Sequence, residues 1–470
     1  MMKFAALWLC IGFTLFLFII DRQKKGGGSL ARWLIVAYVA MIATRAVSSW
    51  FNLGIEVVTP DDYLEGSPFD RNIFIGFLVL AMLAIFRRSV NWEWVQQNNK
   101  LIILFFLYAA LSVLWSDYAL VSFKRWVKGA GLLVMVMLLL TEDDPVEALR
   151  WVFRKTAILL IPISIVLIKY FPEFGRSYTV SGGQQFTGVT GNKNMLGALC
   201  FVYGVFFVWD LLAVRRGTVE RGSNTLLVNI LMLAMIAYLF RKADSATSLV
   251  CFILGTAIVL ILELSEMKQN IGRFGVYLAI VLLLFGTLEA LFGLSEAVIT
   301  ALGRDMTFTG RVDIWSDVIS MARNPLVGSG YESFWLGDRA QRMWDVYSSR
   351  LNQAHNGYIE IYLNLGIIGL VLLSLMILTG YKNILLRIMS GDPIGSLRMA
   401  LFLTALLYNF SEAAFKTGLI WFVFFFCCLD YQPKQAVQAQ PLVKRIRRVP
   451  ACRLAGTAGG RSLHGCHRAE

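Results

Sequence analysis

The sequence predicts an all-α polytopic membrane protein with about 12–13 transmembrane helices and one long external loop that contains short amphipathic helices. Hydrophobic residues make up 57% of the 470 residues and charged residues only 16%, whereas a soluble protein carries about 25% charged residues. The mean hydropathy is +0.62. The apolar residues also gather into separate segments, and a helix of roughly 20 such residues crosses a bilayer.

The apolar segments predict the transmembrane helices one by one. They lie near 4–20, 33–51, 72–86, 101–116, 126–140, 151–168, 194–214, 225–240, 245–262, 274–294, 357–379, 398–411 and 417–430. The first has the composition of a signal peptide, but it lacks a small-residue cleavage site and is followed by Asp21-Arg22-Gln23-Lys24-Lys25. We therefore expect it to be retained as a helix.

Lysine and arginine residues indicate which connections face the cytoplasm. The connections 21–32, 87–100, 141–155, 215–224, 263–273 and 380–398 hold 18 Lys and Arg, and the connections 52–71, 116–125, 169–193, 241–244 and 411–416 hold 9. Cytoplasmic loops carry the excess of these residues, so the first set is predicted to be cytoplasmic. The N-terminus and the long loop 295–356 then lie outside, and the C-terminal tail lies inside.

This orientation divides the chain into four parts. Residues 1–294 form a transmembrane bundle of about ten spans, 295–356 a long periplasmic loop, 357–430 the C-terminal transmembrane helices, and 431–470 a disordered, basic cytoplasmic tail. The tail holds eight Lys and Arg against one Glu, and the whole chain has a formal net charge of +13. The basic charge is therefore largely local, which argues against a folded nucleic-acid-binding surface.

The cysteines and histidines give no clear sign of a disulfide or a metal site. Cys10, Cys200, Cys251, Cys427 and Cys428 fall in apolar segments, and Cys452 and Cys466 fall in the tail. None lies in an external loop, so we expect no disulfides. His464 and His467 lie beside Cys466 but fit no common zinc spacing, and we expect neither a metal nor a cofactor.

The long loop contains one helix that the sequence defines well. Thr309 can cap it, and Asn324-Pro325 ends it. Val312, Trp315, Ile319 and Ala322 fall on one face at helical spacing, and this face packs either on the transmembrane bundle or on the outer leaflet. Asp313 and Asp317 fall on the opposite face, where they either hold a divalent ion or are solvated.

Arg311 is the first candidate for binding an anion. It lies in the first turn of this helix, where a cation opposes the helix dipole unless an anion is bound there. The alternative is an ordinary surface arginine paired with Asp305 or Asp313. The loop 295–356 holds six arginines and no lysine, and arginine is the better bidentate ligand of phosphate oxygens. Gly328-Ser329-Gly330 lacks the Lys-Ser/Thr of a P-loop.

Two further groups of basic and polar residues lie on the same predicted side. Arg176 follows one span, and Lys193-Asn194 opens the next. Arg241-Lys242 belongs to a very short hinge between two spans, and ionisable residues at membrane depth are candidates for a functional site. We expect Arg241 to act in catalysis and Arg176, Lys193, Asn194 and Lys242 to bind substrate. The alternative is that these side chains snorkel to the interface.

His355 stands where the long loop re-enters the membrane, and it is the only histidine before the tail. An imidazole can accept a proton from a hydroxyl at neutral pH, so His355 is the candidate general base. Asn356 follows it, and Glu360, one helical turn later, can orient it or replace it. We count both among the candidate substrate-binding residues. The alternative is a packed, hydrogen-bonded histidine.

Four motifs together resemble the O-antigen ligase/polymerase superfamily, and especially its exopolysaccharide polymerases. They are Gly310-Arg311 with Asp313-Ile314-Trp315; Asn324-Pro325-Leu326-Val327-Gly328-Ser329-Gly330; His355-Asn356-Gly357-Tyr358 with Gly366-Ile367-Ile368-Gly369; and Thr187-Gly188-Val189-Thr190-Gly191-Asn192-Lys193-Asn194. The resemblance extends over roughly residues 100–430 by the order and spacing of the motifs.

The resemblance implies an inverting, metal-independent glycosyltransferase of the bacterial inner membrane. The donor would be an oligosaccharide on undecaprenyl diphosphate at the periplasmic face, and the acceptor a growing polysaccharide. His355 matches the histidine proposed as catalytic in the family, and Arg311 matches an arginine that binds the diphosphate. A second such arginine belongs to a Ser-Arg pair, and Arg241 lies four residues before the corresponding Ser245. Membrane lipids, chain-length regulators and flippases are the implied partners.

Three other functions remain open from the sequence. The first is an O-antigen ligase, which transfers the glycan to a lipid A-core acceptor. The second is a secondary transporter or lipid flippase, which predicts inverted repeats and broken helices at the membrane midplane. The third is a peptidoglycan-type polymerase, which needs a carboxylate in an external loop.

Overall fold

The computed structural model describes residues 2–21, 28–53, 66–178, 182–218, 224–264, 266–267, 270–277, 279–280, 283, 308–347 and 350–431. Most of the predicted span 274–294, the first part of the long loop with Asp305, and the tail from residue 432 lie outside these ranges. The regular secondary structure of the described part is helical apart from one short hairpin. Its strands are β1 (Arg176–Tyr178) and β2 (Gln184–Phe186), which pair antiparallel.

The helices confirm the predicted all-α fold. They are α1 (Met2–Ile20), α2 (Leu30–Ala43), α3 (Val47–Trp50), α5 (Pro68–Phe86), α6 (Trp92–Asn98), α7 (Lys100–Leu111), η1 (Ser112–Trp115), α8 (Ala119–Leu140), α9 (Pro145–Tyr170), α10 (Pro172–Gly175), α11 (Lys193–Arg216), α12 (Thr225–Ala243), α13 (Ala246–Leu262), η2 (Ile271–Arg273), α17 (Phe308–Ser320), α18 (Gly337–Val346), α19 (Gly357–Met389), α20 (Gly395–Ser411) and α21 (Leu419–Cys428). Every predicted span except 274–294 overlaps one of them, or two in the case of 33–51 and 101–116.

Length and composition separate these helices into two groups. Six of the described helices are long and apolar enough to cross a membrane, or seven if α6 and the α7–η1 helix, bent by 82°, count as one span. The helices α2, α13 and α21 are apolar but shorter, and α8 carries Lys124, Arg125 and Lys128. The chain is thus a multi-pass membrane protein, and the count of 12–13 spans stays a prediction.

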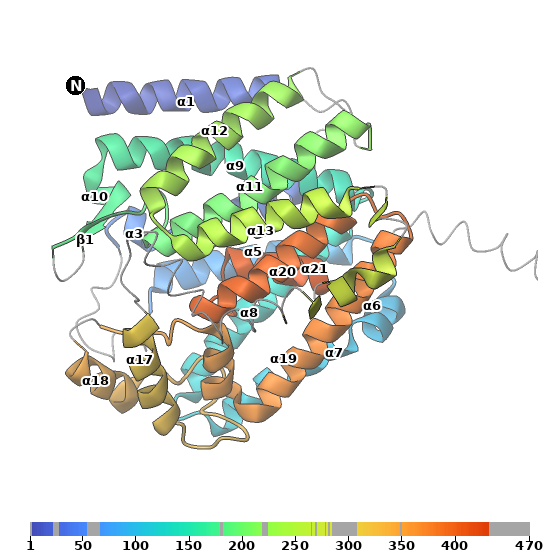
Figure 1. Ribbon diagram of the computed structural model, residues 1–470. Coiled ribbons are helices and arrows are strands. Elements are labelled where there is room, and N and C mark those ends of the chain that lie inside the picture. The colour runs from blue at the N-terminus through green and yellow to red at the C-terminus, as the bar shows by residue number, and fades with distance from the viewer. Residues whose placement is uncertain are drawn as a thin grey trace, which may run out of the picture. The chain divides into compact units, whose positions relative to one another are not determined.

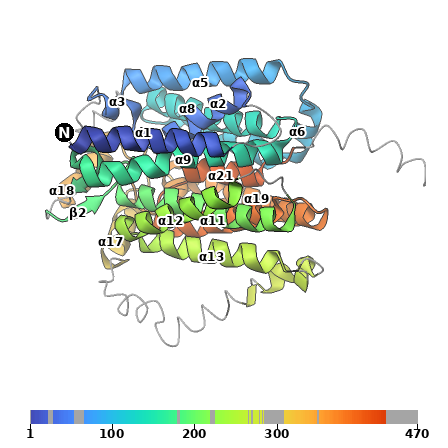
Figure 2. The same cartoon turned by 90° about the horizontal axis from the view of Figure 1, so that it is seen from above.

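The connections sort to the two ends of the helices as the charge pattern predicts. In two perpendicular views, α3, the β1–β2 hairpin, α17 and α18 lie at one end and α6 lies at the other (Figures 1 and 2). The first end therefore collects the connections that are predicted to be external. We call it the loop end.

The opposite end is held together by a buried network of ions. Arg154 of α9 donates to Asp21 after α1 and to Asp210 of α11, and Asp210 also accepts from Arg150. The side chains of Arg154 and Asp210 are fully buried. Removing one member of such a network leaves a buried charge without a partner, which costs about 3–5 kcal/mol. The network therefore fixes α1, α9 and α11 relative to one another.

The long loop contains two short helices, α17 and α18, but α17 packs on a different face from the predicted one. Ile314 and Val318 are buried, whereas Val312 and Ile319 are about half exposed. The predicted face was therefore wrong in part, because the i, i+4 pair Ile314–Val318 meets the apolar residues of α18 and α19. Val312 and Ile319 are left as an apolar strip on the outside. The helix begins at Phe308, so Thr309 lies inside it.

The helix α19 is broken at Gly366, and the long loop fills the break. Gly366 has φ +66° and ψ −164°, so the backbone groups on both sides lose their helical partners. The loop supplies new ones: Ser329 and Gly330 donate to the carbonyls of Leu363 and Asn364, and Ile367 and Ile368 donate to those of Pro325 and Leu326, over 2.8–3.2 Å. A break in a membrane helix is tolerated when its backbone groups find such partners.

We expect Gly366→Ala to destabilise the protein by about 1–3 kcal/mol. The new methyl group would overlap the carbonyl of Leu326, and φ at this position favours glycine. Thermal unfolding in detergent measures the effect. The control is Gly76→Ala in α5, where a methyl group meets no atom within 4 Å and should stabilise the helix by about 0.5–1 kcal/mol. Equal unfolding midpoints for the two variants would contradict the role given to the break.

Candidate functional site

Four helices begin around one short stretch of chain at the end of α20. The amide of Asn356, which caps α19, donates to the carbonyl of Phe410. The hydroxyls of Thr247 in α13 and Ser411 lie 2.8 Å apart. Asn194 of α11 and Arg311 of α17 both donate to Glu412. Helix N-termini carry partial positive charge, so this point of the molecule favours a negative group.

Glu412 is the side chain that joins the candidate residues. It is 6% exposed. Its Oε1 accepts from Nδ2 of Asn194 over 2.7 Å and from Arg311 over 3.2 Å. Its Oε2 lies 3.5 Å from Nδ1 of His355. The carboxylate therefore brings together Asn194, Arg311 and His355, which precede Glu412 in the sequence by 218, 101 and 57 residues.

Sequence reasoning missed Glu412, although a signal was present. Ser411-Glu412-Ala413-Ala414 joins two apolar segments, as Arg241-Lys242 does, and an ionisable residue between two spans is a functional candidate. The same short connection contains Lys416. Its ammonium donates to Oε1 of Gln353 over 3.0 Å, close to His355 in the chain.

His355 is held in an unusual backbone conformation with one ring nitrogen turned inward. Its φ is +52°, a region that non-glycine residues seldom adopt and that is enriched at functional sites. Nδ1 faces Glu412 at 3.5 Å and Gln353 at 3.4 Å. The side chain is 28% exposed. The side chain is therefore partly accessible to a bound molecule.

The guanidinium of Arg311 faces the same carboxylate. It donates to Glu412 and to the backbone carbonyl of Ser411, and its side chain is 22% exposed. Its carboxylate partner in the described part of the chain is thus Glu412, whereas Asp313 is exposed and Asp305 lies outside the described residues. A partly exposed arginine in this position can still contact a ligand.

Asn356 and Glu360 have structural contacts. Asn356 accepts from the N–H groups of Tyr358 and Ile359 as the cap of α19. Oε1 of Glu360 accepts from Nε1 of Trp335 and from the N–H of Ala354. The orienting contact to His355 that the sequence suggested for Glu360 is therefore made by Glu412. Glu360 instead lines a neighbouring cavity.

The other predicted basic residues form a second group at the loop end. The cations of Arg176 and Lys242 both lie over the ring of Phe186 in β2, at 5.6 and 5.0 Å. Lys193 lies 3.9 Å from the carboxylate of Asp244, and Asn194, the next residue, is the one that contacts Glu412. Arg241 is exposed, and the described residues give it no contact with His355 or Arg311.

Two neighbouring cavities adjoin this cluster. One of about 290 Å³ is lined by Asn194, Gln353, Tyr408 and Glu412. The other, of about 350 Å³, is lined by Tyr331, Trp335 and Glu360. Asn352, Ala413, Lys416 and Thr417 line both. Cavities of this size hold small ligands, so the pair offers space for a ligand beside Glu412.

Ion pairs and hydrogen bonds attach the long loop beside these cavities. Arg323 and Arg339 both bind the carboxylate of Asp117, at 2.6 and 2.8 Å, and the hydrogen bond from Arg339 lowers the pKa of Asp117. Asp317, one of the two candidate ion ligands, accepts from the hydroxyl of Tyr347. No group of three or more His, Cys, Asp or Glu gathers among the residues that the structure describes.

These observations define a polytopic helical membrane protein with a histidine–carboxylate–arginine cluster at one end. Comparison with known proteins shows which proteins the chain resembles. Residues 195–374 match the family model described as O-antigen ligase. The chain is also 26% identical over 312 residues to the exopolysaccharide production protein ExoQ of Rhizobium meliloti, an alignment that covers 61% of this chain and 66% of that relative.

The two matches confirm the resemblance to the O-antigen ligase/polymerase superfamily, on its ExoQ-like side. They support a membrane protein of the ligase or polymerase type. The aligned part spans just under two thirds of the curated relative. The family match includes Arg311 and His355 but ends before Glu412.

We expect Glu412→Ala to lower the stability of the protein by about 1–3 kcal/mol, because Asn194 and Arg311 lose a buried acceptor. Glu412→Gln should cost less, since the amide oxygen still accepts hydrogen bonds. The midpoint of thermal unfolding in detergent measures both. Asp338→Ala, which changes an exposed carboxylate of the same loop, serves as the control and should stay within about 0.5 kcal/mol. If Glu412→Ala matched this control, Glu412 would not organise the site.

Proposed function

We propose that the protein is a membrane glycosyltransferase that polymerises undecaprenyl-diphosphate-linked oligosaccharide units into exopolysaccharide at the periplasmic face of the bacterial inner membrane. The observation that carries the proposal is the convergence of His355 and Arg311 on Glu412 in a chain that resembles this family. A base, a cation and a dry, shaped site are the requirements of the reaction.

Arg311 supplies the charge for the leaving group. The donor's glycosidic bond breaks toward a diphosphate, whose negative charge grows in the transition state, and preorganised cations stabilise that charge. Arg311 lies among four helix N-termini, and Lys193 follows the capping residue of one of them. Arg176 and Lys242 extend the cationic surface around Phe186. When the diphosphate binds, Arg311 exchanges part of its contact with Glu412 for phosphate oxygens.

His355 is the general base. Its Nε2 accepts the proton of an acceptor sugar hydroxyl while that oxygen attacks C1 of the donor sugar. The bond from C1 to the phosphate oxygen breaks on the opposite side, so the configuration at C1 is inverted. Glu412 faces Nδ1 and stabilises the imidazolium that forms, as a buried carboxylate does for a catalytic histidine. The fixed cations take the charge-stabilising role that a metal ion has in other transferases.

A ligase with a lipid A-core acceptor would use the same chemistry, since only the acceptor differs. A deletion strain separates the two: single repeat units on the carrier accumulate without a polymerase, and long chains on the carrier accumulate without a ligase. We expect single units. Chain-length regulators and flippases are the partners that such a polymerase needs. Nothing in the site favours a transporter.

We predict that His355→Ala abolishes polymer growth, because His355 is the group that takes the hydroxyl proton in the proposed mechanism. The assay uses purified protein and a lipid-diphosphate oligosaccharide, without nucleotide or added metal. Wild-type protein should lengthen the chain under these conditions, and His464→Ala, which changes a histidine of the tail, should behave like wild type. Unchanged yield and length with His355→Ala, at equal protein levels, would exclude this residue as the base.

We predict that Arg311→Lys is nearly as harmful as Arg311→Ala in the same assay, with a loss of about 100-fold or more. A lysine cannot reproduce the planar, bidentate contact of a guanidinium with phosphate. The matched control is Arg323→Lys, at an exposed arginine of the same loop whose partner is Asp117. Full activity of Arg311→Lys would show that a point charge is sufficient.

A further inference from the structure

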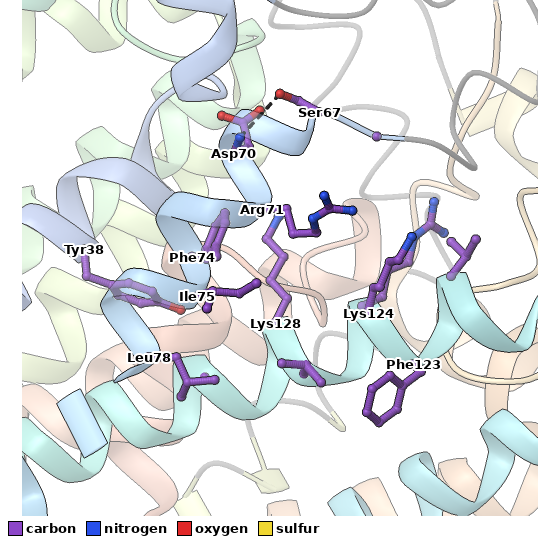
Figure 3. Close-up of a pocket in the computed structure, with 15 residues that line it drawn as sticks. Tyr38, Ser67, Asp70, Arg71, Phe74, Ile75, Leu78, Phe123, Lys124 and Lys128 are labelled. Atoms are coloured by element: carbon purple, nitrogen blue, oxygen red, sulfur yellow. Dashed lines mark hydrogen bonds between the residues drawn. The ribbon is translucent and has the colours of Figure 1, made fainter. Parts of the chain in front are cut away.

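A third cavity, of about 410 Å³, lies between α5 and α8, away from His355. Tyr38, Phe74, Ile75, Leu78 and Phe123 supply apolar surface, as Figure 3 shows. Arg71 of α5 and Lys124 and Lys128 of α8 extend into the same space (Figure 3). Arg125 also lines it. This cavity, the groove between α5 and α8, therefore combines apolar walls with a cluster of four cations.

Among the residues that the structure describes, the cations that line this groove outnumber the carboxylates that line it. Asp70 lines the groove, but its carboxylate accepts from the N–H and hydroxyl of Ser48. Glu332 lines the adjoining cavity with Arg125 and Lys128. Lys128 lies over the ring of Phe74 at 4.4 Å. Arg125 donates to the backbone carbonyl of Glu332, so Arg71, Lys124 and Lys128 are the cations by which the described part of the groove favours an anion.

The groove is open to the surface that a membrane would cover. Only 11% of the apolar window of α5 is buried, and Ile75, Leu80 and Leu83 are about half exposed. On α8, Leu120 and Phe123 are also exposed. An occupant that brings both an apolar chain and an anionic group, namely a phospholipid-like or polyprenyl diphosphate, matches both parts of the groove. A free phosphate would leave the apolar walls without a partner.

The groove is connected to the site through shared residues. Arg125 and Lys128 line both the groove and the 350 Å³ cavity. That cavity shares Asn352 and Lys416 with the 290 Å³ cavity, which Gln353 and Glu412 line beside His355. The groove and the two cavities are therefore neighbours around shared side chains.

We propose that the groove between α5 and α8 binds the diphosphate of a second polyprenyl-linked substrate, the acceptor. This inference rests on the proposed function. The donor's diphosphate is attached to the reacting carbon and must lie beside His355. The acceptor's diphosphate is separated from the attacking hydroxyl by sugar residues, and the two intervening cavities provide the space for them. The protein thus has two sites for lipid diphosphates, one at Arg311 and one at the groove.

The test measures how many molecules of farnesyl diphosphate the full-length protein binds in nanodiscs. Wild-type protein should bind two. The variant Lys124→Gln/Lys128→Gln should lower the affinity of one of the two sites for farnesyl diphosphate by about 30-fold, roughly fivefold for each cation removed. The affinity of the other site should be unchanged. The control Arg87→Gln/Lys100→Gln removes two cations of the opposite end of the bundle and should bind two.

A second variant tests the groove without changing its charge. Gly131 lines the groove, and a methyl group there would lie 3.7 Å from Leu78, so Gly131→Met fills apolar space. It should also lose one equivalent of farnesyl diphosphate. If both groove variants bound two equivalents, or if wild-type protein bound only one and lost it with Arg311→Gln, the proposal would be overturned.

Two further measurements separate this proposal from others. Inorganic pyrophosphate should compete at the groove at least tenfold more weakly than farnesyl diphosphate, and equal competition would assign the groove to a free phosphate instead. Arg311→Gln should lose the other equivalent. If Arg311→Gln still bound two equivalents while the groove variants lost one, the groove would be confirmed as a diphosphate site. Arg311 would then be excluded as the donor site of the proposed function.

Discussion

A broken membrane helix must find new partners for its freed backbone groups, and this requirement fixes the geometry of the whole loop end. At Gly366 the partners come from residues 325–330 of the long loop. The loop is therefore tied to the first half of α19, and Phe334 is tied to the same half through the amide of Asn364. In the chain, His355 lies between these loop residues and the half of α19 to which they are attached. The attachments therefore restrict where His355 can lie.

The second constraint is electrostatic. Four helix N-termini and Arg311 create positive potential around Phe410–Glu412, and Glu412 is the carboxylate that balances it. A buried carboxylate is costly unless it is paired, and Asn194, Arg311 and His355 supply the pairs. Under the proposed function, the donor's diphosphate competes with Glu412 for the guanidinium of Arg311.

The sequence predicted the helices well because apolar length is a strong signal, and 101–116, 151–168 and 357–379 each recur as helices. It also brought His355 and Arg311 into one site. It did not predict Glu412, whose importance depends on three contacts from distant segments. The face of α17 was also assigned incorrectly, since Val312 and Ile314 are equally apolar and only the position of α18 and α19 decides which is buried. The groove at Lys128 depends on α5 and α8 lying side by side, which no local pattern reveals.

The ion network at the opposite end affects how the chain is made. Asp21 is synthesised long before its partner Arg154, and Arg154 long before Asp210. At about 5–20 residues per second, roughly 10–40 s pass between the first member and the last. An unpaired charge is expensive inside a bilayer during this interval. The first helix must therefore wait at the translocon or near water until the ribosome has delivered α11, so that insertion and packing of the N-terminal half are completed together.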